Sequence, residues 1–466
     1  MQERIFMTDR KQVSIIGAGL AGCEAALLLA DAGVRVTLYE QKPCHFSAAH
    51  TRTSYAELVC SNSLKADRLD SAGGMLKAEM RALGSHLLPV ADTVRVAAGG
   101  ALAVDREGFS DGVTALIEAH PNITVVHEEI ASLPPEDGPL TLIATGPLTS
   151  DRLAAALTEV IGEERLYFYD AAAPIVTAES IDRSKVFAAS RYGRGEDDYL
   201  NCPFHKDDYE AFAAALAGAE RAHLHSADDP LTVYEGCMPI EVLAARGADT
   251  MRYGPLRPVG LVDPHTGHRP WANVQLRCEN AEKTLYNLVG FQTNLKFGEQ
   301  KRVFSMIPGL ENAEFVRYGV MHRNTFLNSP RLLDGALALK TRPNILFAGQ
   351  ITGFEGYMES AACGLLAGWD MLRRLQGLGP LQLPETTMLG SLARYIATEN
   401  KDFQPMGANM GILPPLEEKP RDKRERYFAV ARRGLADLRE YLERQGCVSL
   451  PSQNFELPEV GMEENG

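Results

Sequence analysis

Three glycines and one glutamate near the start of the chain have the types and spacing that point most directly to a chemistry. Gly17, Gly19 and Gly22 follow the G-x-G-x-x-G pattern. In this pattern the first glycine permits a tight turn, the second lets the backbone approach a pyrophosphate, and the third lets a helix pack on a strand. Glu40 is placed to accept hydrogen bonds from ribose hydroxyls. The spacing therefore predicts a dinucleotide site.

The segments around these residues are those that a dinucleotide site requires. Residues 13–16 predict a buried strand, residues 23–32 an Ala- and Leu-rich helix that stops at Gly33, and residues 34–39 a second strand. The N-terminus of such a helix offers free N–H groups and a positive dipole end to phosphates. The alternative is a glycine-rich turn in an α/β domain that binds no nucleotide.

A strand, a glycine turn and a helix occur again late in the chain. Residues 344–349 predict a buried strand, residues 350–356 a turn, and residues 357–375 a helix. Flavoproteins with two such units complete their FAD site in this way, so the late unit favours FAD over NAD as the resident cofactor. The neutral Gln350 stands where many of these proteins have an acid. The alternative is a buried strand with its covering helix.

A further glycine, Gly146, follows the strand predicted at residues 140–144 and suggests another close approach of the backbone to the dinucleotide. The residues that we expect to contact the cofactor are Gly17, Ala18, Gly19, Leu20, Ala21, Gly22, Glu40, Gly146, Gly349, Gln350, Gly353 and Tyr357.

Composition and charge restrict the class of protein. The chain has 466 residues, 45% of them apolar, which is ample for a sizeable core and for two or about three domains. It contains no apolar run of about 18 residues, and residues 1–10 lack the apolar centre of a secretory signal. We therefore expect a cytoplasmic protein without a membrane span. The net charge of −14 argues against non-specific nucleic-acid binding but allows a local basic face.

Eight cysteines are scattered along the chain without C-x-x-C spacing, so neither a zinc knuckle nor a redox dithiol is indicated locally. Residues 41–66 predict a long loop rich in small polar and reactive residues beside the cofactor, which is typical of a functional segment. Its His45 and His50 have no further ligand-spaced residues beside them, and we expect no metal.

Basic residues cluster at residues 419–433, with Tyr427 and Phe428 among them. The segment 419–443 predicts one amphipathic helix. A solvated charged face is the usual interpretation of such a run, and a phosphate-contacting face is the alternative.

The order of these segments predicts an α/β architecture. We expect a Rossmann-like FAD-binding domain of the glutathione-reductase type, interrupted by a smaller strand-rich α/β insertion domain. The boundaries that we predict are 1–170 for the first part of the FAD-binding domain, 171–325 for the insertion domain, and 326–466 for the second part with its C-terminal helix.

Beyond these local patterns, six stretches distributed in order along nearly the whole chain resemble the folate- and FAD-dependent tRNA (uracil-5-)-methyltransferases, the TrmFO family. These stretches are residues 15–22, 56–64, 234–241, 287–296, 315–324 and 347–353. Those around Cys60, Cys237 and Gln350 are specific to this family and its closest relatives. Pro270, Trp271 and Phe354 carry bulkier rings than we expect for the family, and a proline expected before His50 is missing.

The resemblance implies a reaction. Methylenetetrahydrofolate would give a one-carbon unit, reduced FAD the electrons, and the T-loop uridine of tRNA at position 54 would receive a methyl group at C5. NAD(P)H would reduce the flavin. The partners implied are thus tRNA, folate and NAD(P)H, with no membrane and no obligate protein partner.

Two cysteines that match family cysteines have the chemistry that this reaction needs. Uracil C5 becomes nucleophilic only after a thiolate adds to C6. The resemblance implies Cys60 as that nucleophile and Cys237 as the base that removes the C5 proton, and the two roles can be reversed. Lys65 and Arg52 are neighbouring cations that would favour a thiolate. Tyr357 and Phe354 are candidates for the folate slot, with core packing as the equal alternative.

Three other functions stay open at this point. The related flavoprotein that modifies wobble uridines of tRNA is longer and carries a C-terminal helical domain. A small-molecule flavin oxidoreductase would agree with the net charge of −14 but leaves the two cysteines unexplained. A non-catalytic flavin-bound factor that folds tRNA is excluded only by those cysteines.

Overall fold

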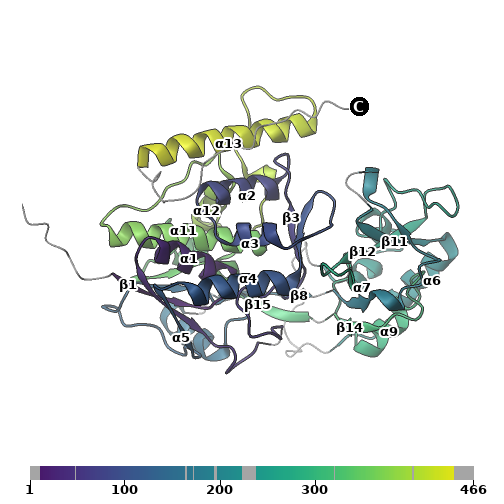
Figure 1. Cartoon of the computed structure of the whole chain (residues 1–466), viewed down its shortest axis with the longest axis horizontal. Helices are drawn as coiled ribbons and strands as arrows, with labels where there is room; N and C mark the ends of the chain where they lie inside the picture. The colour runs from purple at the N-terminus through teal and green to yellow at the C-terminus, as the bar shows by residue number, and fades with distance from the viewer. Residues whose placement is uncertain are drawn as a thin grey trace, which may run out of the picture.

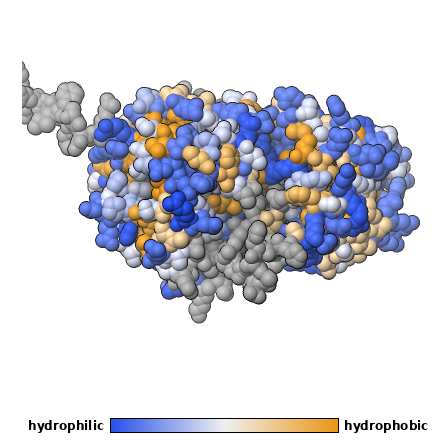
Figure 2. Space-filling model, turned by 90° about the horizontal axis from the view of Figure 1, so that it is seen from below, coloured by the Kyte–Doolittle hydropathy of each residue, from blue (hydrophilic) through white to orange (hydrophobic). Residues whose placement is uncertain are grey.

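A computed structural model describes residues 11–47, 49–162, 165–171, 173–193, 197–222, 238–319, 321–400 and 403–445. The chain forms two lobes along its long axis, with β1 and α1 in one lobe and β11, β12 and α6 in the other (Figure 1). The face seen from below is mainly polar, and its apolar side chains gather in small separate patches (Figure 2).

The larger lobe is built on a six-stranded sheet in the order β16-β17-β7-β1-β2-β6, parallel except for the edge strand β16. These strands are β1 (Gln12–Ile16), β2 (Arg35–Glu40), β6 (Ile123–His127), β7 (Thr141–Ile143), β16 (Ala338–Leu339) and β17 (Arg342–Phe347). Because β17 pairs with β7 and β7 with β1, the late strand joins the early ones in one sheet. Their carboxyl ends therefore meet at one edge, where α/β sheets bind ligands.

Helices cover both faces of this sheet, as the two-sided hydrophobic pattern of its strands requires. Ile15, Leu142 and Leu346 belong to the same buried cluster as α1 (Leu20–Asp31) and α11 (Tyr357–Leu375). Ile16 and Ile143 instead join Leu153, Leu157 and Ile161 of α5 (Asp151–Ile161) on the opposite face. Successive side chains of a strand point to opposite faces of the sheet, so neighbouring residues such as Ile15 and Ile16 belong to different clusters.

Smaller elements complete this lobe. A three-stranded sheet pairs β3 (Ser63–Ala66) and β4 (Arg95–Val96) with β5 (Ala101–Val104). The remaining helices are α2 (Ala72–Ala82), α3 (Leu87–Thr93), α4 (Arg106–Ala119), α10 (Ser329–Leu332), α12 (Met388–Ala397) and α13 (Lys423–Gln445). The long helix α13 lies across the outside of α2 and α12 (Figure 1), so the amphipathic helix expected at residues 419–443 forms over nearly the same range.

The second lobe has its own antiparallel sheet in the order β10-β11-β12-β13-β9-β14. Its strands are β9 (Ile175–Thr177), β10 (Phe187–Ala188), β11 (Tyr199–Phe204), β12 (Ala272–Cys278), β13 (Leu285–Leu288) and β14 (Phe315–Arg317). Its helices are α6 (Lys206–Ala217), α7 (Ile240–Ala245), α8 (Thr250–Tyr253) and α9 (Phe297–Phe304). This lobe has a separate core, in which each ring contacts the next in the series Phe204, Phe212, Phe291 and Phe304.

An antiparallel ribbon joins the two lobes. It consists of β8 (Arg165–Ala171) and β15 (Met321–Leu327), which pair along their whole length. The boundaries predicted after residues 170 and 325 fall on this ribbon. The chain therefore enters and leaves the second lobe side by side, as an insertion requires.

Candidate functional site

The glycine turn between β1 and α1 leaves space where a ligand is expected. A Cβ on Gly17 would lie 2.6 Å from Ala144 O, and one on Gly22 would lie 1.9 Å from Gly17 O, so both positions require glycine for packing. A Cβ on Gly19 would meet only Ala144 O, at 3.9 Å. Gly19 is therefore free of protein contacts on the side where a pyrophosphate would approach.

The N-terminus of α1 is available to an anion. Gly19 caps this helix without a side-chain hydrogen bond, and its first turn contains no acidic residue. The Glu40 carboxylate instead accepts the N–H groups of Ala18 and Lys42, each at 2.9 Å. Glu40 thus ties the glycine turn to the end of β2, and the positive end of the helix dipole stays free for phosphate.

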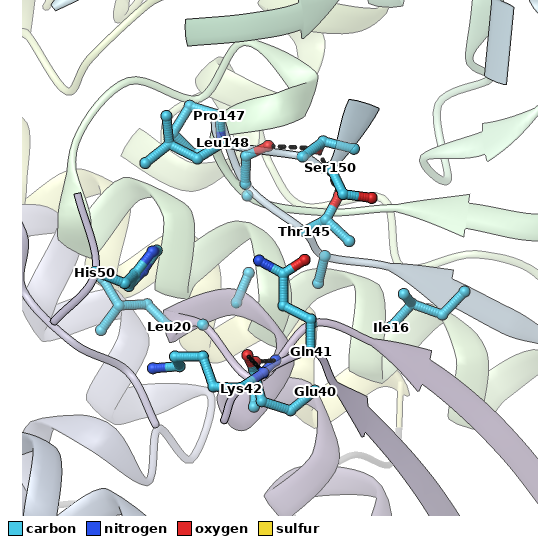
Figure 3. A pocket seen from close by; sticks show the side chains of 18 of the residues that line it. Ile16, Leu20, Glu40, Gln41, Lys42, His50, Thr145, Pro147, Leu148 and Ser150 are labelled. Carbon is cyan, nitrogen blue, oxygen red and sulfur yellow. Dashed lines mark hydrogen bonds between the residues drawn. The ribbon is translucent and has the colours of Figure 1, made fainter. Parts of the chain in front are cut away.

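A cleft runs along this edge of the sheet, and its empty space, with the open solvent at its mouth included, is about 1100 Å³. Its wall includes most of the expected cofactor residues: Gly17, Ala18, Gly19, Leu20, Ala21, Glu40, Gly146, Gly349, Gln350 and Tyr357. Figure 3 shows the Gln41 side chain reaching into the cavity, between Glu40 and Lys42 on one side and Thr145 and Ser150 on the other. The cleft thus connects the early glycine turn with the late turn after β17.

Two of the expected cofactor residues do not line this cleft. Gly22 lies under the turn, where its missing side chain allows α1 to pack on β1. Gly353 has a positive φ of 95°, and a Cβ there would lie 2.6 Å from the Phe403 ring. Both glycines therefore allow the close packing of the backbone at the site without lining the cleft.

The late turn packs directly on α1. Gly349 has a φ of 83°, and a Cβ added to it would lie 3.0 Å from the Ala21 side chain. The amide of Gln350 donates to the buried Glu355 carboxylate at 2.7 Å. The neutral Gln350 is thus held by an acid five residues further on, which places both a carboxylate and an amide beside the cleft.

Cys60 lies where the cleft meets the second lobe. Cys60 is half-buried, and its neighbour Val59 lines the cleft. The backbone N–H of Cys60 donates to the phenol oxygen of Tyr357 at 2.6 Å, and the N–H of Ser61 donates to the same oxygen at 3.2 Å. The first residue of α11 therefore fixes the cysteine loop against the cofactor cleft.

Two arginines hold the carbonyl groups just before Cys60. Arg106 of α4 donates to Leu58 O at 2.7 Å, and Arg317 of β14 donates to Val59 O. Arg106 is also paired with Glu279 of the second lobe, at 2.6 Å. Both lobes thus supply a guanidinium group to the same loop.

The other side of the loop is clamped by β12. Asn62 is fully buried and donates to Val104 O and to Cys278 O, each at 3.0 Å. Arg277 donates to the Asn62 side-chain oxygen at 2.9 Å and to the Ser61 hydroxyl at 2.7 Å. A buried polar network of this kind is costly when incomplete and rigid when satisfied, so the cysteine loop has one defined position.

Burial and neighbouring charges shift the pKa values of the groups around the loop. Burial lowers the pKa of Arg106, but the charges of Glu279, Tyr357 and Cys60 outweigh burial and the pKa is raised overall. Burial, with the like charge of Arg106, lowers the pKa of Arg317. Burial and the charge of Cys60 raise the pKa of Tyr357 above its usual range, which keeps the phenol neutral. A thiolate or an enolate formed here would meet two guanidinium groups.

The cations that the sequence suggested for this role are engaged elsewhere. Lys65 pairs with the buried Glu359 carboxylate at 2.6 Å. Arg52 pairs with Glu107 and Asp111, each at 2.8 Å. Arg106 and Arg317 take their place, and sequence spacing gives no signal for them because their partners in the loop lie far away along the chain.

Cys237 lies outside the described residues. The residues that follow it are described: Glu241 is fully buried and accepts the Thr293 hydroxyl at 2.9 Å and the Asn294 N–H at 2.8 Å. Two of the stretches that carry the family resemblance, 234–241 and 287–296, therefore meet at the start of α7.

The folate slot expected at Phe354 is not available. Phe354 is fully buried in the core of the larger lobe, so core packing explains this ring. Exposed aromatic surface occurs instead on the second lobe, where Phe297 stacks on Tyr318 with ring centroids 4.9 Å apart and Tyr318 stacks on Phe315 at 5.2 Å. Phe297 is 56% exposed. Tyr318 follows Arg317, which brings this stack to the side of the Cys60 loop.

Several classes of site are not found among the described residues. No three His, Cys, Asp or Glu side chains in this part of the chain are placed to hold a metal ion. Within the same residues, no helix has the length and apolar character needed to cross a membrane. His50 hydrogen-bonds Ser47 at 2.6 Å and lines the cleft, while His45 lies 3.5 Å from Glu129.

The fold and the cleft define a dinucleotide-binding protein of the two-unit flavoprotein type with an inserted second lobe. A family model described as GIDA, glucose inhibited division protein A, matches residues 12–379. Two structures of Aquifex aeolicus GidA share this fold, with TM-scores of 0.66 at 16% and 17% identity. The similarity spans 94% of this chain in both comparisons. It spans 77% of the GidA chain in the first structure and 79% in the second.

Relatives of much higher identity carry one name, methylenetetrahydrofolate–tRNA-(uracil-5-)-methyltransferase TrmFO. The protein from Moorella thermoacetica is 58% identical over 92% of this chain and 97% of its own length. Those from Acetivibrio thermocellus and Enterococcus faecalis are each 55% identical, over 93% and 91% of this chain and 99% and 97% of their own lengths. The chain belongs to the TrmFO family.

Proposed function

We propose that this chain transfers a one-carbon unit from methylenetetrahydrofolate to C5 of the T-loop uridine of tRNA, position 54, and forms 5-methyluridine. The observation that carries this proposal is the position of the Cys60 loop, which Tyr357 joins to the cofactor cleft and Arg317 joins to the second lobe. A nucleophile held between a cofactor cleft and an inserted lobe can reach a base presented from outside.

FAD suits the cleft on structural grounds. The open space above Gly19 and the uncapped N-terminus of α1 suit its pyrophosphate, and Glu40 lies at the end of β2 where ribose hydroxyls are expected. Gln350 and Tyr357 also line the cleft, and they would hold the flavin part of the cofactor. When bound and reduced, FAD supplies the electrons that bring the transferred carbon to the methyl level.

The protein groups around the uracil have separate tasks in this proposal. The Cys60 thiolate adds to C6 of uracil, and the resulting negative charge is stabilised by Arg106 and Arg317. Cys237 removes the proton from C5 once the carbon–carbon bond has formed, and the departure of Cys60 from C6 restores the C5=C6 double bond of the uracil. The roles of the two cysteines can be exchanged without changing the overall reaction.

The folate ring has a candidate surface at Phe297 and Tyr318. Their stacked rings offer the flat apolar contact that a pterin needs, and they are connected to the Cys60 loop through Arg317. We assign the reduction of the flavin to NAD(P)H and place the protein in the cytoplasm, where tRNA and a reduced thiol occur together. We expect activity without an obligate protein partner.

The test uses unmodified tRNA, NADPH and methylenetetrahydrofolate labelled in the one-carbon unit. We expect label in 5-methyluridine at position 54 with the wild-type protein. Cys60→Ala should abolish transfer while the protein keeps bound FAD and its yellow colour. Label at a wobble uridine, or rapid NADPH oxidation without label in tRNA, would instead support one of the other flavoprotein functions.

A further inference from the structure

A second hollow lies on the inserted lobe, and it shares no lining residue with the cofactor cleft. Its empty space, with the open solvent at its mouth included, is about 870 Å³. It is formed by the end of β11, the start of α6, one residue of α8 and the turn that precedes β12, with the lining residues Pro203, Phe204, His205, Lys206, Arg252, Asp263, Thr266, His268, Arg269, Pro270 and Trp271. Helix α6 lies at the end of the molecule opposite the large sheet (Figure 1).

An aromatic ring with two cations over it forms the centre of this hollow. The guanidinium carbon of Arg252 lies 3.8 Å from the centroid of the Trp271 ring, and the Lys206 ammonium lies 5.6 Å from it. Arg252 also donates to Trp271 O at 2.9 Å, which holds the stacked arrangement. Both distances are within the range of cation–π attraction.

The Trp271 indole has an unused hydrogen-bond donor. Its N–H is buried and has no partner among the described residues, whereas the indole N–H of Trp369 donates to Leu83 O at 3.0 Å. A buried donor without a partner destabilises the folded protein.

The charge of the hollow is opposite to that of the chain. Lys206, Arg252 and Arg269 line it together with two histidines, although the chain has a net charge of −14. The only carboxylate among its lining residues, Asp263, already accepts from the His265 N–H at 2.9 Å. Glu210 and Asp249 lie outside the lining and pair with Lys206 and Arg252 at 3.7 and 3.0 Å. An anion would therefore find cations at the surface of the hollow.

The neighbouring surface extends this contact beyond the size of a small ligand. Tyr253 is 80% exposed, and the Arg252 guanidinium carbon lies 5.8 Å from its ring, so Arg252 links Tyr253 to Trp271. Val262, next to the hollow, is 63% exposed. An exposed ring beside cations is a surface that RNA can bind through base stacking and phosphate contacts.

We propose that this hollow is a second RNA subsite, in which a phosphate of the tRNA substrate lies between Lys206 and Arg269 and an adjacent base stacks near Trp271 and Tyr253. It rests on the proposed function, because the RNA concerned is the tRNA whose uridine reaches Cys60. The subsite would hold the body of the tRNA at a distance from the reacting base. It thereby gives a chain of net charge −14 a local anchor for a polyanion.

The first test measures the affinity of the holoenzyme for unmodified tRNA as a function of salt. Each lost phosphate contact reduces the slope of log K against log salt by about 0.7–0.9. We expect Lys206→Gln/Arg269→Gln to weaken tRNA binding about tenfold at moderate salt and to reduce the slope by about 0.7–0.9, because the two side chains share one phosphate. The matched control is Lys185→Gln/Arg302→Gln, which removes two exposed cations of the same lobe that pair with Glu311 and Glu299. The control should bind tRNA as the wild type does.

The second test uses tryptophan emission, since Trp271 and Trp369 are the two tryptophans of the chain. Titration with tRNA should change the emission of the wild type and leave that of Trp271→Phe unchanged, because Trp369 is buried. Equal tRNA affinity and slope in both double variants would overturn the proposal. So would a rise in the KM of NADPH or methylenetetrahydrofolate in place of weaker tRNA binding. Methylation by the wild type tests the proposed function separately, because binding is measured without turnover.

Discussion

The phenol oxygen of Tyr357 accepts the backbone N–H of Cys60 at 2.6 Å, across 297 positions of sequence. Tyr357 is the first residue of α11 and lines the cofactor cleft. The contact therefore makes the position of the candidate nucleophile depend on the turn that completes the cofactor site. It also explains why a tyrosine, with an acceptor at the end of a rigid ring, suits this position.

Tyr357→Phe tests this dependence. The variant keeps the ring but leaves the N–H groups of Cys60 and Ser61 without their acceptor, which costs about 1–3 kcal/mol. We expect the rate of 5-methyluridine formation to fall about 10- to 100-fold. The content of bound FAD, measured from its visible absorbance, should stay near that of the wild type. Unchanged turnover would show that the phenol does not position the loop.

Gly19→Ala and Gly22→Ala form a matched pair that separates ligand space from packing. A methyl group at position 19 approaches no described protein atom closer than 3.9 Å, and the backbone there has an ordinary φ of −78°. We expect this apoprotein to melt within a few degrees of the wild type and to bind FAD at least about tenfold more weakly. Isothermal titration of the apoprotein with FAD measures the affinity of the variant and of the wild type.

The methyl group at position 22 would instead lie 1.9 Å from Gly17 O. Overpacking of this kind costs about 1–3 kcal/mol or more, so Gly22→Ala should lower the melting temperature of the apoprotein itself. Normal FAD affinity in Gly19→Ala would contradict the placement of the pyrophosphate at this turn.

Phe297→Ala tests the proposed folate surface. Phe297 is exposed and stacks on Tyr318, so its removal exposes the remaining rings without opening a core cavity. We expect the KM for methylenetetrahydrofolate to rise about tenfold, in line with an aromatic pair worth about 0.5–1.5 kcal/mol beyond its buried area. The melting temperature and the affinity for tRNA should stay unchanged. Phe297→Tyr, which keeps a ring, is the control and should retain most of the activity.

Asp370 in α11 gives a prediction about pH and stability. Burial raises its pKa to about 7, and its Oδ2 atom has no partner among the described residues, while Oδ1 accepts the Leu381 N–H at 2.6 Å. The native state therefore holds a proton on this group that the unfolded state releases above pH 4. The stabilisation that it gives is complete at low pH and is lost as pH rises towards 7.

Asp370→Asn removes this titration. The difference in melting temperature between the variant and the wild type should grow in favour of the variant from pH 4 to pH 7 and then level off. The corresponding free-energy change is at most about 4 kcal/mol. A difference that is independent of pH would show that Asp370 is ionised in the folded protein at all these pH values.

Local patterns in the sequence were sufficient for most of the nucleotide-binding unit. The glycine spacing predicted the turn at Gly17 and the strand and helix on either side of it, because each step involves residues adjacent along the chain. The strand and helix predicted around Gly349 also form. Their membership in the same sheet as β1 depends on strand pairing, which the sequence suggested only through similarity to two-unit flavoproteins.

The folate slot shows where such patterns fail. Phe354 and Tyr357 are close together along the chain, and the sequence analysis named both as candidates for the folate slot, with core packing as the equal alternative. The fold buries the Phe354 ring completely, whereas Tyr357 is half-buried in the wall of the cleft and its phenol oxygen binds the Cys60 loop. Burial depends on what packs from elsewhere in the chain, in this case the C-terminal residues around Phe403, and so a local pattern does not reveal it.

The sequence by itself determined the class of cofactor fold, because the glycine spacing carries that information along the chain, and its resemblance to the TrmFO family implied Cys60 as the candidate nucleophile. Only the tertiary structure decided which groups surround Cys60. Arg106, Arg317 and Tyr357 come from α4, β14 and α11, and they meet at one loop only after the two lobes have packed together. Hydrogen bonds act over about 3 Å, so the contacts between these distant residues exist only in the folded chain.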